Sequence, residues 1–347
     1  MCGIVGAVAE RNVTPILVEG LQRLEYRGYD SAGVALVQAD GEVQRRREVG
    51  KVVNLSNNVD AEPLTGSLGI AHTRWATHGS VQQTNTHPHM SGNDLALVHN
   101  GIIENYITLR EELQSQGYVF ASDTDSEVIV HLIHNCLGDG GLLHAVRRAV
   151  KRLDGAYAIA VCWADEPDRI VAARSGCPLV VGKGIGENFL ASDVLALKAV
   201  TDRFIFLEEG DLVDLRRDRI DIWSIDNEAV LRADVRIEMA KDDFDKGNFR
   251  HHMQKEIFAQ PQVLKETMEG RIGKQTVLEE AFGVGAKDIF DRTEAITIVA
   301  CGTSYYAASV ARYWIEDLVG IPCQVEIASE FRYCLLYTSP SPRDGRE

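Results

Sequence analysis

The order of the apolar segments is the feature that most constrains the fold of this chain. A short apolar strand at residues 4–8 opens it, a run of helical patterns occupies the middle, and short strands dominate again from Tyr157 to Leu215. Strands before and after a run of helices favour an α+β sandwich over repeated βαβ units. We therefore predict that the first domain is built from sheets covered by helices.

The helices of this domain carry recognisable start and stop signals. Thr14-Pro15 predicts a helix start with a capping side chain and a proline at the first helical position, and Gly28 predicts its end. Thr124-Asp125-Ser126-Glu127 has the capping-box pattern and predicts the start of an amphipathic helix. Further helices are expected after Gly101 and from Leu142 to Leu153.

A polar, charged segment between Val235 and Gly247 predicts a domain boundary. We expect a helix from Asn248 that ends near Pro261. Further on, an apolar strand at 295–300 runs into Cys301-Gly302-Thr303-Ser304, a helix through Leu318 and a second strand at 323–327. This order predicts a βαβ unit of a parallel sheet. The predicted division is a first domain at 2–239, a linker at 240–250, a second domain at 251–333 and a tail at 334–347.

Composition and charge exclude several classes of function. The net charge of −15 argues against nucleic acid or an anionic membrane as the main partner. Arg45-Arg46-Arg47 is the one basic run, and we interpret it as a solvated strand face. No signal peptide opens the chain and no apolar run is long enough to cross a bilayer. The seven cysteines lack paired short spacings, which favours a reducing cytoplasm over a disulfide framework.

Cys2 directly follows the initiator methionine, in the segment Met1-Cys2-Gly3-Ile4-Val5-Gly6. Removal of Met1 would place a thiol and an α-amine, which titrates at about 7.7–8.0, on one residue. This is the arrangement of an N-terminal nucleophile that carries its own base. Gly3 and Gly6 would allow a tight turn and close approach of a substrate. The competing interpretation is a buried structural cysteine.

Three further residues or pairs could complete such a site. Asn100-Gly101 at a strand end could donate two N–H groups to an oxyanion, or form an ordinary Asn-Gly turn. Arg74 could hold a carboxylate bidentately, or form a surface salt bridge. Asp125 could bind an ammonium group, or favour the dipole of its helix. Trp75 could gate passage into the site, but a tryptophan is more often a core residue.

Two other segments could bind ligands. The histidines superficially resemble metal ligands, but no pair has the His-x-x-x-His spacing, so we expect neither a metal nor a cofactor; these histidines are His72, His78, His87, His89 and His99. Cys301-Gly302-Thr303-Ser304 lies where a strand gives way to a helix and could bind the phosphate of a phosphate monoester, or be a turn without a ligand.

Taken together, these stretches resemble the glutamine–fructose-6-phosphate aminotransferases (isomerizing), also called glucosamine-6-phosphate synthases. The resemblance covers nearly the whole chain to about Tyr333. The matching motifs are MCGIVGAV, LEYRGYDSAG, GIAHTRWATHG, THPH, LVHNGIIENY, SDTDSEVI, LDGAYAIAV, HHMQKEIFAQP and ACGTSYYAA. The first six would suit any class II glutamine amidotransferase, whereas MQKEIFAQP and CGTS narrow the resemblance to the sugar-phosphate enzyme.

The resemblance implies an αββα N-terminal-nucleophile sandwich followed by part of an α/β/α parallel-sheet sugar-isomerase domain. It also implies that Cys2 attacks the glutamine carboxamide and that Asn100 and Gly101 form the oxyanion hole. Arg74 would hold the α-carboxylate of glutamine and Asp125 its α-ammonium.

The resemblance also implies roles for further residues near glutamine and the sugar phosphate. Arg27 would lie on a mobile part of the glutamine site, and Trp75 would gate the passage of ammonia. Thr77, His78 and Gly79 would line the glutamine pocket, and Thr303 and Ser304 would belong to the sugar-phosphate site. The complete enzyme is expected to be a homodimer that uses glutamine and fructose 6-phosphate.

The chain departs from the family pattern in two places. Ser80-Val81-Gln82 stands where the family usually carries a proline, for which we expect altered loop stiffness and unchanged chemistry. The segment Cys334–Glu347 matches nothing in the family, is rich in Ser and Pro, and is interpreted as a disordered tail of foreign sequence after a truncated reading frame.

We therefore expect the glutamine-hydrolysing half of the family's reaction, without synthesis of glucosamine 6-phosphate by this chain alone. Three alternatives remain at this point. They are another class II amidotransferase, such as the phosphoribosyl enzyme, a non-catalytic sugar-phosphate sensor that binds through Thr303 and Ser304, and a zinc hydrolase built on the histidines.

Overall fold

The computed structural model describes residues 2–38, 41–75, 79–138, 140–237, 249–268, 271–272, 276–282 and 285–331. The chain divides into two compact units, Met1–Asp245 and Lys246–Glu347. The tail expected at 334–347 and most of the linker expected at 240–250 lie outside the described residues.

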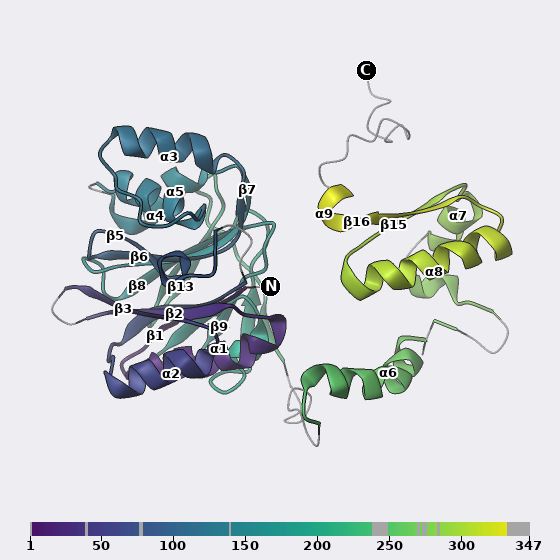
Figure 1. The fold of residues 1–347 in the computed structure, drawn as a ribbon, viewed down its shortest axis with the longest axis horizontal. Coiled ribbons are helices and arrows are strands. Elements are labelled where there is room, and N and C mark those ends of the chain that lie inside the picture. The colour runs from purple at the N-terminus through teal and green to yellow at the C-terminus, as the bar shows by residue number, and fades with distance from the viewer. Residues whose placement is uncertain are drawn as a thin grey trace. The chain divides into compact units, whose positions relative to one another are not determined.

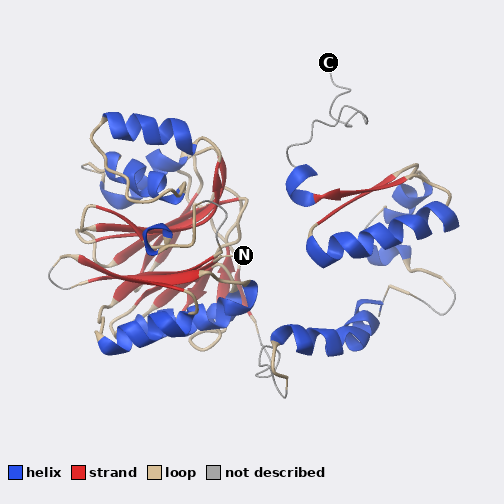
Figure 2. Cartoon of the chain, viewed as in Figure 1, coloured by secondary structure: helices blue, strands red, loops and turns tan. Residues whose placement is uncertain are grey.

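The first unit is a sandwich of two mainly antiparallel sheets between two layers of helices (Figures 1 and 2). Helices α1 (Thr14–Leu24) and α2 (Val52–Ala61) cover one sheet, and helices α3 (Tyr106–Ser115), α4 (Ser126–Asn135) and α5 (Gly141–Val150) cover the other. The predicted αββα sandwich is therefore confirmed.

Within the described residues, the two sheets contain eight and six strands. The larger sheet has the order β14 (Asp234–Arg236), β11 (Arg203–Phe206), β9 (Val180–Lys183), β10 (Asn188–Ala191), β1 (Gly3–Val8), β4 (Leu68–Arg74), β2 (Ser31–Val37) and β3 (Val43–Val49). The smaller sheet has the order β13 (Ile220–Trp223), β12 (Leu212–Arg216), β8 (Arg169–Ser175), β7 (Gly155–Trp163), β6 (Leu95–Ile103) and β5 (His89–Ser91). Short 3-10 turns are η1 (Glu25–Arg27), η2 (Gln83–Asn85) and η3 (Val194–Leu197).

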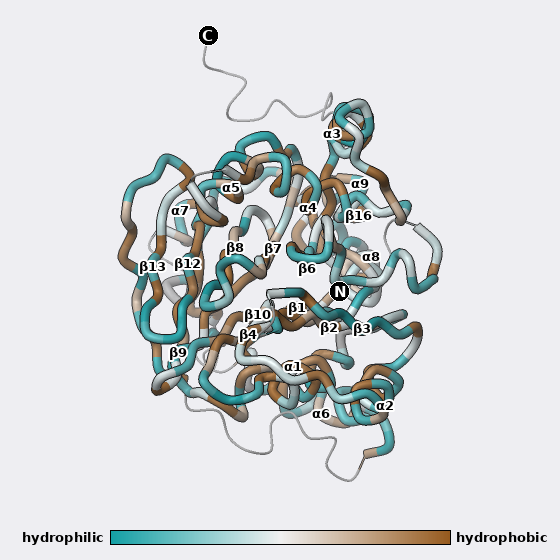
Figure 3. The backbone as a smooth tube through the Cα atoms, turned by 90° about the vertical axis from the view of Figure 1, so that its left-hand side faces the viewer, coloured by the Kyte–Doolittle hydropathy of each residue, from teal (hydrophilic) through white to brown (hydrophobic). Residues whose placement is uncertain are grey.

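Strand β1 is buried on both faces because helices cover one side of its sheet and the second sheet covers the other. Ile4 and Val8 pack between the two sheets, while Val5 and Ala7 pack against the helical layer. This alternation is the two-residue period of a strand. In Figure 3 the strand runs as a brown, apolar stretch through the middle of the unit. Gly3 and Gly6 lie inside this strand, so the tight turn expected from them is wrong.

The bounds of the first helix confirm some of the start and stop signals read from the sequence. Pro15 lies in the first turn of α1, and Gly28, at φ +98°, ends the η1 turn that follows it. The N-cap is Val13, which makes no side-chain capping bond, and the backbone N–H of Thr14 donates to the side chain of Asn12 at 3.2 Å. Thr14 instead donates its hydroxyl to the carbonyl oxygen of Leu64 at 2.9 Å, so the predicted capping by Thr14 is wrong.

The basic run on β3 is not a solvated strand face. Arg45 and Arg47 are half-buried and donate to the carbonyl oxygens of Pro88 and Thr86, each at 3.0 Å. Burial lowers the pKa of Arg45 to about 10. These two side chains therefore brace the segment that follows η2, because buried guanidinium N–H groups need acceptors.

The second unit contains the predicted βαβ arrangement. Strand β15 (Ile296–Ala300) pairs in parallel with β16 (Cys323–Ile327), and helix α8 (Gly302–Leu318) connects them. The unit also contains α6 (His252–Met268), η4 (Glu279–Phe282), α7 (Ala286–Asp291) and α9 (Ala328–Phe331). Helix α6 continues past Pro261, so the predicted end near this proline is wrong.

Among the described helices of both units, none is long and apolar enough to cross a membrane.

Candidate active site

Cys2 lies immediately before β1, beside the end of the neighbouring strand β4. The backbone N–H of Trp75 donates to Cys2 Sγ at 3.2 Å, and the thiol faces the carbonyl oxygen of Trp75 at 3.5 Å. Burial raises the pKa of the Cys2 thiol, and the backbone hydrogen bond from Trp75 opposes this effect. A thiol in this state needs a base to become a nucleophile.

Asn100 approaches Cys2 from the opposite sheet. Its side-chain Nδ2 donates to the backbone carbonyl oxygen of Cys2 at 3.3 Å, and its Oδ1 lies 2.9 Å from His72 Nε2. The Asn100 side chain is buried, and β6, which carries it, contacts both β1 and β4. The structure therefore brings a carboxamide N–H to the backbone of the residue that carries the predicted nucleophile.

Gly101 follows Asn100 inside β6, where it pairs with Tyr157 of β7. Its φ of +130° is unfavourable for other residues, and a Cβ atom would lie 1.9 Å from the carbonyl oxygen of Ala156. The prediction that Asn100-Gly101 ends a strand is wrong, because β6 continues to Ile103. The Asn-Gly turn considered above is excluded for the same reason.

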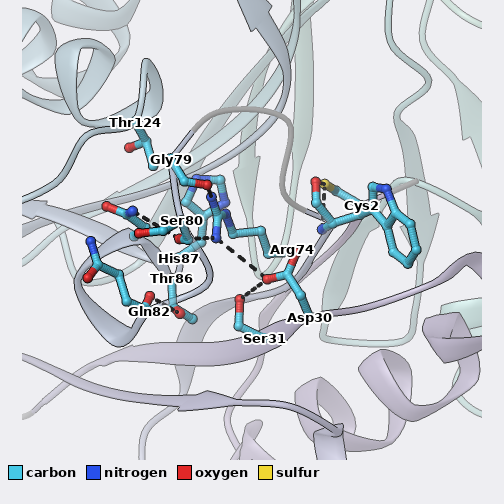
Figure 4. A network of polar contacts seen from close by, with 12 residues as sticks. Cys2, Asp30, Ser31, Arg74, Gly79, Ser80, Gln82, Thr86, His87 and Thr124 are labelled. Atoms are coloured by element: carbon cyan, nitrogen blue, oxygen red, sulfur yellow. Dashed lines mark hydrogen bonds and ion pairs between the residues drawn. The ribbon is translucent and has the colours of Figure 1, made fainter.

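Arg74, the last residue of β4, is buried, which excludes the surface salt bridge. Its Nη1 lies 3.5 Å from Asp30 Oδ1, and its guanidinium donates to the carbonyl oxygens of Gly79 and Ser80, each at 3.3 Å. Figure 4 shows the side chain directed between Asp30 and the Gly79–Ser80 backbone. These contacts hold the guanidinium in one orientation.

Asp125 is buried immediately before α4. Its Oδ2 accepts the backbone N–H of Ile103 at 2.9 Å, and its Oδ1 accepts the Ser126 hydroxyl at 3.3 Å. The carboxylate is therefore tied to the end of β6, the strand that carries Asn100.

The capping box predicted at Thr124 and Glu127 is wrong. Asp125 is the N-cap of α4, without a side-chain capping bond, and Glu127 accepts the backbone N–H groups of Ala121 and Ser122 at 2.9 and 2.7 Å. Burial acts to raise the pKa of Glu127, but the nearby His131 ring, whose Nε2 lies 3.7 Å away, and the hydrogen bonds from Ala121 and Ser122 outweigh it and lower the pKa to about 2. Glu127 thereby anchors the segment that leads into Asp125. The helix it begins is buried on all sides from Ser126 to Ile133 rather than amphipathic.

Trp75 is 53% exposed and is not a core residue. A Cβ atom at Gly28 would lie 2.7 Å from Trp75 Cε3, so the ring packs directly on the backbone at the end of η1. The absence of a side chain at Gly28 gives the indole its place beside Cys2.

The other predicted site residues are placed only in part. Gly79 contributes the carbonyl oxygen that Arg74 contacts. Thr77 and His78 lie outside the described residues, and so does the side chain of Arg27, whose backbone belongs to η1. Thr303 and Ser304 are exposed in the first turn of α8, in the second unit.

The described histidines contact one another and neighbouring polar groups. His87 lies against His72 with ring centroids 4.1 Å apart, His89 Nε2 lies 3.1 Å from Thr124 Oγ1, and His99 Nδ1 lies 2.8 Å from Ser126 Oγ. No group of three His, Cys, Asp or Glu side chains within the described parts of the chain has the geometry of a metal site. His72, which was considered above only as a metal ligand, is the residue beside Asn100 that sequence reasoning missed.

Known proteins resemble this chain in one domain and in fold. A glutamine amidotransferase domain family matches residues 72–199, which include Arg74, Asn100 and Asp125. Among solved structures, the glutamine phosphoribosylpyrophosphate amidotransferase of B. subtilis shares the fold, with a TM-score of 0.58, 20% identity and coverage of 93% of this chain and 65% of that one. The allosteric regulatory enzyme of purine biosynthesis has a TM-score of 0.57 at 26% identity, over 65% of this chain and 49% of that chain.

Curated relatives are more similar in sequence. The glutamine–fructose-6-phosphate aminotransferase (isomerizing) of Pseudomonas putida is 60% identical over 98% of this chain and 56% of its own length. The enzyme of the same name from Haemophilus influenzae is 56% identical over the same shares of both chains. These matches confirm the resemblance inferred from the sequence motifs. The chain is homologous over nearly its whole length to the glutamine–fructose-6-phosphate aminotransferases, of which it spans about half, and its residues 72–199 match the glutamine amidotransferase domain family.

Proposed function

We propose that the first unit hydrolyses glutamine to glutamate and ammonia, with Cys2 as the nucleophile. The observation that carries the proposal is the approach of Asn100 Nδ2 to the Cys2 backbone, at 3.3 Å, from the opposite sheet. Removal of Met1 would free the α-amine of Cys2 to take the proton of its own thiol. The thiol whose pKa is raised by burial needs such a base.

The proposed reaction has two steps. The sulfur of Cys2 forms a bond to the carboxamide carbon of glutamine, and the oxygen of the tetrahedral intermediate accepts hydrogen bonds from Asn100 Nδ2 and the Gly101 N–H. The C–N bond breaks, and ammonia leaves with the proton taken from the thiol. Water then cleaves the thioester, which releases glutamate and restores the thiol.

The amino-acid end of glutamine is proposed to lie between Arg74 and Asp125. Arg74 is already oriented by Asp30 and by two carbonyl oxygens, and a planar guanidinium suits a carboxylate. Asp125 is fixed by Ile103 and offers negative charge to an ammonium group. Thr77, His78, Gly79 and Arg27 are proposed to line the same pocket, and Trp75 to gate the passage of ammonia.

The full aminotransferase reaction named in the relatives is also a proposal for this chain. The first turn of α8 would bind the phosphate of fructose 6-phosphate through Thr303 and Ser304, because N–H groups at a helix start favour anions. A homodimer is proposed for the complete enzyme. We expect the 347 residues by themselves to release ammonia without forming glucosamine 6-phosphate.

The test is glutamate release from glutamine by the purified chain, with removal of Met1 verified by mass spectrometry. We expect activity that disappears in Cys2→Ala and persists in Cys177→Ala, the matched control at another half-buried cysteine. Glutamate release that survives Cys2→Ala would overturn the proposal, and so would an inactive, correctly processed wild type.

Two additions to this assay separate the other functions. Binding of fructose 6-phosphate without any glutamate release would favour a sugar-phosphate sensor. Activity that is lost in a chelator would favour a metal-dependent hydrolase.

A further inference from the structure

Asn100 can present either of two chemically opposite groups to the nucleophile. Its carboxamide has a donating Nδ2 and an accepting Oδ1, and a rotation of the amide exchanges them. Only Nδ2 can stabilise an oxyanion, since an oxygen in its place would repel the developing negative charge. The direction of this one side chain therefore matters to the proposed glutaminase reaction.

Two neighbours determine the direction of the carboxamide. The backbone carbonyl oxygen of Cys2 can only accept a hydrogen bond, so the atom 3.3 Å from it is Nδ2. This leaves Oδ1 facing His72 Nε2 at 2.9 Å. Because Oδ1 can only accept, Nε2 of His72 must carry a hydrogen.

The surroundings of His72 keep its ring neutral and fixed beside Asn100. Its side chain is fully buried on β4, opposite Ile4 of β1 and Gly33 of β2. His87 packs against its ring, with Nδ1 lying 3.0 Å from Nδ1 and 3.1 Å from Nε2 of His72. Burial lowers the pKa of His72 to about 3, which keeps the ring neutral. A neutral ring has one donor and one acceptor, so its tautomer can select one orientation of Asn100.

We propose that His72 is a positioning residue whose Nε2–H holds Oδ1 of Asn100, so that Nδ2 faces the oxyanion that forms when Cys2 attacks the carboxamide. The inference rests on the proposed glutaminase function and deepens it. His72 does not touch the substrate and acts through Asn100. The geometry assigns this role to a histidine because a donor on a rigid ring reaches across from β4 to β6.

The kinetic test compares His72→Leu with His72→Gln. Leucine removes the donor, and we expect kcat to fall about 10- to 100-fold with little change in KM, approaching the loss of one oxyanion-hole donor. Glutamine carries an N–H₂ group that can replace Nε2–H, so His72→Gln is expected to recover most of the activity. His134→Leu is the matched control, since His134 bonds Ser91 instead of Asn100.

A double-mutant cycle separates positioning from general damage to the fold. In an Asn100→Ala background, His72→Leu should cost less than about 2-fold, because there is no carboxamide left to orient. Equal losses in both backgrounds would overturn the proposal. Alkylation of Cys2 by iodoacetamide needs no oxyanion hole and should proceed at the wild-type rate in His72→Leu.

A spectroscopic test keeps this inference distinguishable from the proposed function. Long-range ¹H–¹⁵N correlations of the ¹⁵N-labelled chain report which ring nitrogen of each histidine is protonated, and His72→Gln assigns the signals. We expect a neutral His72 protonated at Nε2 at pH 7. A ring protonated at Nδ1 would overturn the positioning role even if glutamine is hydrolysed, while an inactive wild type with the Nε2–H tautomer would reject only the glutaminase.

Discussion

The backbone N–H of Trp75 donates to the sulfur of Cys2 across 3.2 Å, although the two residues are 73 positions apart in the chain. The antiparallel pairing of β1 with β4 brings them together. The same end of the sandwich receives Asn100 from β6 and the guanidinium of Arg74. The nucleophile is therefore held by the sheet itself.

The first prediction concerns the reactivity of Cys2. Burial raises the pKa of its thiol, so at pH 7 it should hold less thiolate than an exposed cysteine, whose pKa is about 8.5. In the chain that retains Met1, we expect iodoacetamide alkylation of Cys2 to be slow at pH 7 and to keep accelerating beyond pH 9. Mass spectrometry of the modified peptide gives the rate. A rate that levels off below pH 8.5 would contradict the burial of the thiol.

The second prediction concerns the guanidinium of Arg74. Arg74→Lys keeps the charge but loses the planar group that contacts Asp30, Gly79 and Ser80 together. Hydrogen bonds to charged groups contribute about 1.5–3 kcal/mol, so KM for glutamine should rise about 10- to 100-fold with a smaller change in kcat. Arg23→Lys on the surface of α1 is the control. An unchanged KM would remove Arg74 from the proposed pocket.

The third prediction separates steric overlap from backbone strain at glycine. Gly101→Ala would place a Cβ 1.9 Å from the carbonyl oxygen of Ala156, so we expect a loss of more than about 4 kcal/mol in the free energy of unfolding. Gly117 also has a positive φ, of +94°, but open space around it, so Gly117→Ala should cost only about 1–3 kcal/mol. Urea unfolding of both variants measures the difference. Equal losses would show that β6 relaxes around the added methyl group.

The fourth prediction concerns stability in acid. Burial is the main cause that lowers the pKa of His72 to about 3 and the pKa values of His87 and His89 well below 6.5. The unfolded chain binds protons at these histidines below about pH 6.5, whereas the folded chain does not until much lower pH. The contribution of these neutral histidines to the free energy of unfolding is therefore fully present above pH 6.5. It declines as the pH falls toward 3, by up to about 1.4 kcal/mol per pH unit for each histidine.

Urea unfolding at pH 7.5, 6.5 and 5.5 tests this decline. In His87→Gln, the slope of the free energy of unfolding against pH should fall by the share of one histidine. In His144→Gln, which changes an exposed histidine, the slope should stay the same. A wild-type stability that is flat between pH 7.5 and 5.5 would mean that these histidines are accessible to protons in the folded chain. Glu127, whose pKa is lowered to about 2 chiefly by hydrogen bonds that outweigh its burial, adds a further loss only below about pH 4.3.

Local patterns predicted the elements better than their ends. The apolar period indicated β1, the helices of the first unit and the parallel β15–α8–β16 arrangement, because that period reports which face of an element is buried. Residue preferences were misleading at two places. Asn100-Gly101 is typical of a turn but lies inside β6, and Pro261 is typical of a helix end but lies inside α6. Pairing with β7 keeps the Asn-Gly pair in the sheet despite its turn propensity.

The sequence by itself determined the chemical groups of the site and the family to which they point: a cysteine after the first methionine, an Asn-Gly pair, Arg74 and Asp125. Only the tertiary structure decided their relationships, including the contact of His72 with Asn100 and the anchoring of the 121–122 backbone by Glu127. The physical reason is that periodicity records burial within one element. A hydrogen bond between strands of two sheets depends on register and packing, which no local stretch of sequence contains.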